Sequence, residues 1–593
     1  MNNVDVILCL QNKHTISIQI VVNLQPLEAI QWFFVALGGK MKRILVAIFS
    51  VFMAFGVARA DCASNEFAVD DECVESKFQV TTTNLDADAT FDFVLTPRGT
   101  FYIDCGADGT LSGPNVSGRK VVRTSATKNQ TYTCTYNTAG VKTIKFGGVA
   151  TAYNTYGNAI RMQSPTMVAG ISGSLGRLFP TIGDGITATA QPWFASVFSG
   201  CTNLTGPIPN GLFDGIYGAP RASMFQNTFS GCANLGRDSV GGTPTYGIPS
   251  GLFGNLTGDP AYHMFESTFS GCSGLTGSIP ANLFGNLSGT PQETMFFATF
   301  SGCSNLTGPI PSGLFGNLTG APAANMFWNT FNGCTNLGRD SIGGTPTYGI
   351  PSGLFGNLSG APQLQMFRQT FNGCSGLTGP IPASLFGDIY GAPVVYMFNS
   401  TFRNCSGLTG SIPANLFGNF VGASANQMFR SVFEGCRGLT GYVPKDMFEN
   451  ITTSNSMAVY QMFSNTNLYT TVQGCPCGTK PAETGWGATT VDGFVVCEVG
   501  AKDNEHWNNG VCTTDCTGAG VSALKTSTGL SYPLLTDATA PQNIHIKVNN
   551  KICTVPLENG AANNAINMRW NGNTYHATVP DEIVPAGFTG QPE

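Results

Sequence analysis

The chain has 593 residues, a net charge of −6 and only 11% Asp, Glu, Lys and Arg, against roughly 25% in an ordinary soluble protein. This sparse, slightly acidic charge excludes the basic surface that nucleic-acid binding requires, and 42% hydrophobic residues exclude a disordered chain. The 74 glycines, with many Asn, Thr and Ser, are typical of a β-rich array with many turns.

The start of the chain contains an export signal. Residues 41–43 are basic at two positions, residues 44–57 are apolar, and Ala58-Arg59-Ala60 is a small-x-small cleavage motif. We therefore expect residues 41–60 to be a signal peptide that is cleaved before Asp61. Residues 1–40 precede this signal and are expected to be untranslated or absent from the mature protein. A retained membrane anchor is the weaker interpretation, because the apolar run is shorter than the ~20 residues of a membrane span.

Residues 61–165 predict a β-sandwich. Short alternating segments between turn signals predict five strands, over 78–83, 89–96, 100–104, 131–136 and 141–146. The stretches Gly99–Asp104 and Tyr136–Lys145 are similar to those of PKD-like domains, and this resemblance implies an immunoglobulin-type sandwich. Residues 166–192 are expected to be a connecting cap.

Four cysteines and two aspartates are the candidate disulfide and metal-binding residues of this module. Cys62, Cys73, Cys105 and Cys134 form an even set in an exported module, which predicts two disulfides. Asp104 and Asp108 are candidate Ca²⁺ ligands, but two carboxylates are few for a calcium site and a turn is favoured.

Residues 193–474 are built from repeated units. The first unit opens with Trp193-Phe194, and later units open with Met-Phe, at Met224, Met264, Met295, Met326, Met366, Met397, Met428 and Met462. From Met224 the steps are 40, 31, 31, 40, 31, 31 and 34 residues, so a long unit returns every third repeat. Self-similarity at such a period predicts a solenoid.

Each unit repeats one apolar set, which predicts its local structure and its core. In the fourth unit the set is Met295, Phe296, Phe300, Cys303, Leu306, Ile310, Leu314, Phe315 and Leu318. Residues 306–311 alternate and predict a short strand with Leu306 and Ile310 inward. Residues 295–303 have helical spacing and predict a short helix or helical turn, whereas residues 316–322 predict a turn. A single unit is too small to fold alone, so neighbouring units are expected to share their cores.

The motif Phe300-Ser301-Gly302-Cys303, followed by Leu306-Thr307 and Ile310-Pro311, resembles the BspA-like leucine-rich repeats of bacterial surface proteins. The resemblance covers about residues 193–470, although the family unit is usually shorter and its strand has one more residue. It implies a leucine-rich-repeat-like solenoid, a secreted or cell-surface location, and adhesion as the function.

Eight cysteines occur once per unit, from Cys201 to Cys436. Their fixed place in the repeat predicts buried free thiols rather than a redox or metal ladder, because parallel side-chain vectors do not suit a disulfide. Four Asn-Leu-Thr/Ser sequons, from Asn255 to Asn357, also recur at one repeat position. Turn-forming asparagine is favoured there over glycosylation.

Residues 475–593 predict a cysteine-rich β module. It holds Cys475, Cys477, Cys497, Cys512, Cys516 and Cys553. Three disulfides are favoured over a zinc site that would include His506, because the spacing fits no standard zinc pattern. Residues 544–557, with a turn at Asn549-Asn550, predict one β-hairpin, and residues 570–573 predict a second hairpin with a two-residue turn.

The sequence contains no recognisable catalytic set. It has five histidines but no Gly-x-Ser-x-Gly or His-Glu-x-x-His motif. We therefore expect no enzyme activity, no cofactor and no metal, and a solenoid that binds a protein or glycan ligand in adhesion or in interaction with a host or envelope. A glycan-degrading enzyme with its site in a flanking module, and a structural envelope spacer, remain the alternatives.

The two long units carry the candidate ligand-binding residues. Units two and five each insert nine residues after the Leu of the Cys-x-x-Leu motif. The inserts add Arg, Asp and Tyr at matched places, and Tyr and Arg are enriched where binding energy concentrates. The predicted site is Arg237, Asp238, Tyr246, Arg339, Asp340 and Tyr348.

Overall fold

The computed structural model describes residues 62–181 and 191–468, apart from 71, 127–128, 155–156, 316, 356, 384, 387, 415, 418, 449 and 454–455, and also 470 and parts of 479–499. Outside these residues, only the backbones of individual strands are described. The chain divides into two compact units, Met1–Cys73 and Val74–Glu593. The expected signal peptide at 41–60 and the cleavage before Asp61 lie outside the described residues.

Two strand pairs begin in the first unit, and the last strand, β4(Glu72–Glu75), runs past its end at Cys73. β1(Asn3–Asn12) and β2(Thr15–Asn23) form an antiparallel hairpin. β3(Glu66–Val69) pairs with β4. The disulfide Cys62–Cys73 closes this short loop, with a Cα–Cα distance of 5.5 Å.

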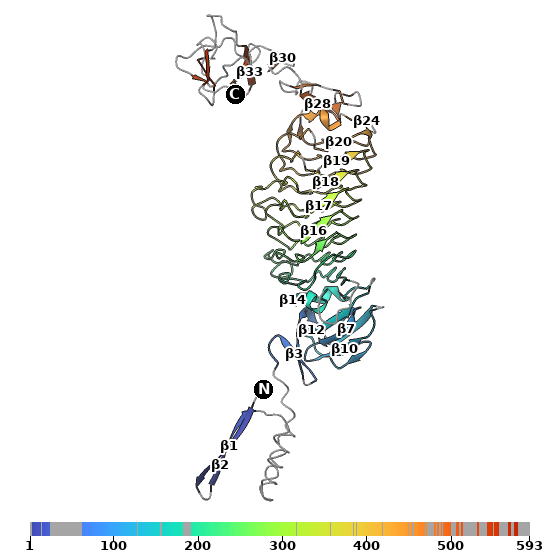
Figure 1. Ribbon diagram of the computed structural model, residues 1–593, viewed down its shortest axis with the longest axis vertical. Helices are drawn as coiled ribbons and strands as arrows, with labels where there is room; N and C mark the ends of the chain where they lie inside the picture. The colour runs from blue at the N-terminus through green and yellow to red at the C-terminus, as the bar shows by residue number, and fades with distance from the viewer. Residues whose placement is uncertain are drawn as a thin grey trace. The chain divides into compact units, whose positions relative to one another are not determined.

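The second unit begins with an antiparallel β-sandwich, which confirms the expected layer structure (Figure 1). One sheet has six strands in the order β14-β5-β12-β7-β10-β9, and the other has four in the order β13-β6-β11-β8. The bounds are β5(Phe78–Leu85), β6(Thr90–Leu95), β7(Arg98–Asp104), β8(Gly109–Ser112), β9(Val116–Ser117), β10(Lys120–Arg123), β11(Gln130–Tyr136), β12(Gly140–Ala152), β13(Ile160–Met162) and β14(Val168–Gly173).

The five predicted strands correspond to β5, β6, β7, β11 and β12. Alternate residues of these strands point into the sandwich, where Phe91, Phe93 and Tyr132 are buried. Cys105 and Cys134 form the second predicted disulfide. A 3-10 turn, η1(Pro165–Met167), and one helical turn, α3(Leu175–Leu178), adjoin β14.

The sandwich core continues into the first repeat. The ring centroids of Phe78 and Phe198 are 6.1 Å apart, and the amide of Met162 donates to the carbonyl of Val197 at 3.1 Å. The sandwich therefore covers the open apolar end of the repeats, which a stacked array requires.

The repeats are joined through the backbone of the segment that runs from Met-Phe to Cys, which we call the Met-Phe segment. Within it, every second amide donates to the next unit; for example, Phe265 donates to Met295 at 3.1 Å and Phe269 to Thr299 at 2.9 Å. The amides between them donate to a carbonyl three residues earlier in the same unit. Half of the amides therefore link units, so that one unit is incomplete without its neighbour.

The predicted helix in this segment is wrong. Every fourth residue is left-handed, with φ of 52° at Thr294, 51° at Ala298 and 75° at Gly302. A right-handed helix does not tolerate such residues, and the segment is a series of turns instead. The error has a simple cause, because a four-residue turn period places apolar residues almost as a 3.6-residue helix does.

The parallel strands lie where the sequence predicted turns. β15(Thr257–Gly258), β16(Asn286–Gly289), β17(Asn317–Gly320), β18(Asn357–Gly360), β19(Asp388–Gly391) and β20(Asn419–Phe420) form one parallel sheet (Figure 1). The segment predicted as a strand makes isolated bridges in most units, such as Gly277 to Leu306, and a two-residue strand in unit eight. Pro309 lacks an amide donor and Gly308 is left-handed, with φ of 72°, so an extended ladder cannot continue there. The sequon asparagine Asn286, which was predicted to form a turn, is exposed and begins the strand β16 instead.

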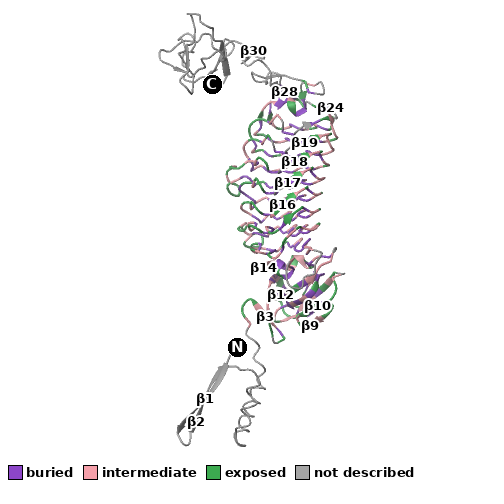
Figure 2. Ribbon diagram, viewed as in Figure 1, coloured by how far each residue is buried: buried purple, intermediate pink, exposed green. Residues whose placement is uncertain are grey.

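The predicted core is confirmed, including Leu306 and Ile310, which are 0% and 2% exposed. Phenylalanine rings stack from unit to unit, and the centroids of Phe269, Phe300 and Phe331 are separated by steps of 5.7 and 5.6 Å. Figure 2 shows buried residues in every turn of the repeats and exposed residues along the outer edges. The core is thus one continuous column to which each unit adds a layer.

The eight repeat cysteines are free and buried, as predicted. Each thiol from Cys232 onward donates to a phenylalanine carbonyl of the preceding unit, as in Cys303 to Phe269 at 3.0 Å. The cysteine therefore supplies both a small apolar body and a hydrogen bond between units. Burial raises the pKa of the Cys303 thiol to about 12, against a lowering effect from the backbone of Cys272.

Short strand pairs follow the main sheet. β21(Gly422–Ala423) pairs with β24(Ile451–Thr453), and β22(Thr440–Gly441) pairs with β25(Asn467–Leu468). β23(Val443–Pro444) precedes the 3-10 turn η2(Lys445–Phe448) and pairs with β28(Phe494–Val499), which also pairs with β26(Thr479–Pro481) and β27(Thr490–Val491). Cys497, in β28, is disulfide-bonded.

Both predicted C-terminal hairpins are present as strand pairs. β32(Asn543–Val548) pairs with β33(Lys551–Pro556) around the predicted turn. β34(Asn567–Trp570) pairs with β35(Tyr575–Thr578), so four residues separate the strands instead of the predicted two. β35 also pairs with β31(Ser531–Tyr532), and β29(His506–Asn508) pairs with β30(Val511–Thr513). The side chains of the other five cysteines lie outside the described residues, so the predicted three-disulfide set stays a prediction.

Candidate ligand-binding surface of the repeats

The two inserts fold as matching loops. In unit two, Arg237 makes an antiparallel bridge to Pro244, and Arg339 makes the equivalent bridge to Pro346 in unit five. Arg237 Nη1 donates to the carbonyl of Gly242 at 2.6 Å, and Arg339 Nη1 does the same to Gly344 at 2.6 Å. Both arginines are half-buried, so their guanidinium groups close the loops from within.

The aspartates of the inserts also have structural partners. Asp238 Oδ1 accepts from the amide of Thr243 at 2.9 Å and from Ser239 Oγ at 2.9 Å. Asp340 Oδ1 repeats this arrangement with Thr345 and Ser341. Four of the six predicted residues therefore hold the loops that carry them.

The side chains that the inserts expose are aromatic and aliphatic. Tyr246 and Tyr348 are each 39% exposed, while Val240 and Ile342 are 60% and 45% exposed. The tyrosines belong to the predicted site, but the two aliphatic tip residues were missed. The signal was an apolar residue inside a Ser-x-Gly-Gly turn, where burial is not expected.

A second candidate surface lies on the Met-Phe segments. In units two to eight, both phenylalanines and the cysteine of this segment never change. Its third position, by contrast, holds Gln226, Glu266, Phe297, Trp328, Arg368, Asn399 and Arg430 in turn. Most of these side chains are only partly buried, so a constant core carries a row of different chemical groups.

The end of this row borders a pocket of about 210 Å³ across units six to nine. All of its lining residues are polar: Arg368, Asn399, Ser400, Arg403, Gln427, Arg430, Ser431, Glu434 and Gln461. Of these residues, Asn399, Ser400 and Ser431 are buried, at 6%, 6% and 4% exposure. Sequence reasoning missed this site, although the changing third position was a readable signal.

Two arginines of the pocket lie against aromatic rings. The guanidinium carbon of Arg368 is 4.8 Å from the ring centroid of Trp328 and 5.0 Å from that of Tyr396. Arg430 lies 5.5 Å from the ring of Tyr460. Such contacts favour a cation and restrict its motion. Burial is the main cause that lowers the pKa of Arg368, and the nearby charge of Arg430 lowers it further.

The third arginine is neutralised within the pocket wall. Arg403 Nη2 donates to Glu434 Oε1 at 3.0 Å, and Arg403 Nε lies 3.0 Å from Glu434 Oε2, so the two side chains form a close ion pair. Among the described residues, Arg368 and Arg430 form no ion pair; each donates to a neutral glutamine, Gln365 at 2.8 Å and Gln427 at 2.9 Å. Arg368 and Arg430 therefore bring two positive charges to the pocket, and Glu434, which pairs with Arg403, does not neutralise them.

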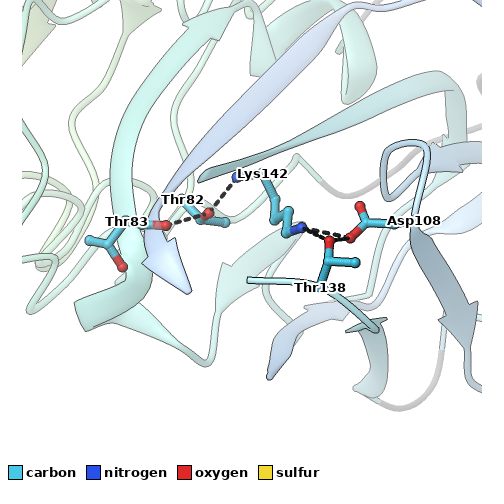
Figure 3. A network of polar contacts seen from close by, with 5 residues as sticks. All are labelled: Thr82, Thr83, Asp108, Thr138 and Lys142. Atoms are coloured by element: carbon cyan, nitrogen blue, oxygen red, sulfur yellow. Dashed lines mark hydrogen bonds and ion pairs between the residues drawn. The ribbon is translucent and has the colours of Figure 1, made fainter. Parts of the chain in front are cut away.

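The two aspartates considered for calcium in the sandwich are paired with cations of the protein. Asp104 lies 3.0 Å from Arg119, and Asp108 lies 2.6 Å from Lys142 Nζ. Figure 3 shows Lys142 directed toward Asp108 and Thr138, while its backbone amide reaches Thr82. Hydrogen bonds from Lys142 and Thr138 lower the pKa of Asp108 to about 2. Asp104 also accepts from the amide of Gly106, as the favoured turn interpretation expects.

The described residues contain no group of three or more His, Cys, Asp or Glu side chains arranged to hold a metal ion. Within that same part of the chain, no helix has the length and apolar character that a membrane span requires. The disulfides are typical of proteins that fold in an oxidising compartment, which points to an extracellular protein.

No protein-family model, curated protein or solved structure matches this chain. The candidate surfaces therefore have to be interpreted from their own chemistry.

Proposed function

We propose that this chain is a secreted or cell-surface repeat protein that binds a glycan or a protein on another surface, and that binding rather than catalysis is its role. The observation that carries this proposal is the row of third positions on the Met-Phe segments. A constant, hydrogen-bonded core there displays a different side chain in almost every unit. Rigid presentation of varied groups favours recognition, because little conformational entropy is lost on binding.

The resemblance to BspA-like leucine-rich repeats supports the same proposal. We interpret the repeats as a solenoid of that type and the N-terminal module as a PKD-like sandwich that closes its first end. The tyrosines and aliphatic tips of the two inserts provide a second contact region. Adhesion to a bacterial or host surface is the activity that this combination favours.

An array of glycans and host surface proteins, probed with the purified exported chain, tests this function. We expect saturable binding to a limited class of ligands. A parallel variant replaces Phe297 and Trp328 with Ala, and its control replaces the exposed Thr257 and Thr319 of the strand face with Ala. Absence of any specific ligand, or equal loss in both variants, would contradict recognition through the Met-Phe row.

The inserts are tested separately. Tyr246→Ala with Tyr348→Ala removes exposed rings and leaves the arginine and aspartate contacts of both loops in place. If the inserts contact the ligand, affinity falls in this variant while the unfolding transition is unchanged. Unchanged affinity would exclude the inserts and leave the Met-Phe row as the binding surface.

A further inference from the structure

We propose that the pocket across units six to nine binds an anionic saccharide, whose carboxylate or sulfate group is held by Arg368 and Arg430. This inference rests on the proposed function and specifies the ligand class of one site within it. Four observations carry it: the unpaired charges, the fixed orientation of both arginines, the polar lining and the size of the pocket.

The charge of the pocket calls for an anion. Arg403 is neutralised by Glu434 through their ion pair, while Arg368 and Arg430 have only neutral hydrogen-bond acceptors among the described residues. Two like charges that share a small pocket repel each other, and a bound anion removes that repulsion. Planar guanidinium groups bind carboxylate or sulfate oxygens through paired N–H donors.

Both arginines are held in place before a ligand arrives. Arg368 lies between the rings of Trp328 and Tyr396, and its Nη1 is bonded to Gln365. Arg430 repeats the pattern two units later, with Gln427 and Tyr460. An arginine that is already ordered loses less side-chain entropy when it binds. Arg368 Nε is buried and has no hydrogen-bond partner among the described residues.

The neutral lining favours a saccharide over an acidic peptide. Besides the charged residues, the pocket is lined by Asn399, Ser400, Gln427, Ser431 and Gln461, some of which already bond to one another or to the arginines. Such groups hydrogen-bond to the hydroxyls of a sugar. A peptide ligand usually needs a pocket for an apolar anchor, whereas every residue that lines this pocket is polar.

The size of the pocket limits what enters it. A volume of about 210 Å³ is below the roughly 300 Å³ at which pockets for drug-sized ligands begin. One charged sugar residue therefore occupies the pocket, and the remaining sugar residues lie outside it. Tyr460 packs against Arg430 of the pocket and is 44% exposed, so the exposed part of its ring is available to a neighbouring sugar.

Titration of the full exported chain with four probes tests the ligand class. The probes are a sulfated hexasaccharide of chondroitin type, an oligogalacturonate of the same length that has carboxylates only, neutral cellohexaose, and hexa-aspartate. We expect one or both charged saccharides to bind, at least about tenfold more tightly than cellohexaose and hexa-aspartate, and more weakly as salt rises. Binding of the sulfated probe alone would show that sulfate is required, whereas binding of the oligogalacturonate would show that a carboxylate is sufficient. Equal binding of cellohexaose, or tighter binding of hexa-aspartate, would overturn the assignment.

A double variant locates the site. Arg368→Gln with Arg430→Gln removes both guanidinium groups, and we expect binding of the charged saccharide to weaken about 100-fold, because two charge-assisted contacts are lost. The control, Arg161→Gln with Arg437→Gln, removes the same charge from exposed positions outside the pocket. It should change affinity by no more than about twofold. Equal weakening in both variants would show a diffuse charge effect and overturn the pocket.

A measurement on the unmodified chain is independent of variant folding. Hydrogen exchange with the bound saccharide should show protection concentrated between about residues 394 and 436, where most of the lining residues lie. Protection confined to other units would overturn the pocket but leave the proposed function intact. Failure of every array ligand to bind would overturn the proposed function itself.

Discussion

Replacing Phe300 with alanine tests how the repeats hold together. Phe300 is 0% exposed, and its ring stacks on Phe269 and Phe331 at 5.7 and 5.6 Å, with a tilted contact to Phe284 at 6.0 Å. A buried Phe→Ala change costs about 3–5 kcal/mol, which includes the lost transfer energy and the cavity left behind. Because all three ring contacts are with the neighbouring units along the stack, we expect the upper half of that range.

The control is Phe297→Ala, three residues earlier in the same segment. Phe297 is partly exposed, and its described ring contact is with Trp328, edge to face at 4.9 Å. Its loss should cost about 1 kcal/mol. The two variants remove the same side chain from the same unit, so their difference isolates burial in the shared column.

Hydrogen exchange followed by mass spectrometry measures the spread of the effect. In Phe300→Ala, protection should fall in units three to five and remain unchanged in β5 and β12 of the sandwich, since stacked repeats couple mainly to their neighbours. A free-energy loss no larger than that of Phe297→Ala, or an equal loss of protection in the sandwich, would refute the proposed coupling.

Four other outcomes are expected. Cys303 should react with a thiol reagent only after denaturation, since it is 0% exposed; rapid labelling of the native chain would contradict its burial. Its folded pKa of about 12 lies above the unfolded value near 8.5, so its stabilisation is complete below about pH 8.5 and is lost as pH rises toward 12, by about 1.4 kcal/mol per pH unit. Urea unfolding should show a shallower alkaline loss in Cys303→Ser. Asp340→Ala should raise hydrogen exchange at the Thr345 amide without shifting global unfolding, because that amide donates to the lost carboxylate. Amino-terminal sequencing of exported protein should begin at Asp61, and an intact Met41 would exclude cleavage there.

Part of the candidate site could be predicted from the sequence, and the rest depended on the tertiary structure. The sequence identified the inserts as distinctive, yet only the structure showed that Arg237 and Asp238 are occupied in closing their loop, while Val240 is exposed. The pocket was not predictable from a single unit. Arg368 and Arg430 are two units apart in the chain and meet at one pocket because the units stack in register.

The sequence by itself determined the repeats, the buried apolar set, the free cysteines and the five main strands of the sandwich. These follow from side-chain polarity and spacing, which act locally. Only the tertiary structure decided which part of each unit is strand and which is turn. A four-residue turn period with left-handed residues at Thr294 and Ala298 resembles a helical period in sequence. The choice depends on amides such as that of Phe300, which donates to the next unit rather than along its own, and that partner exists only once the units are stacked.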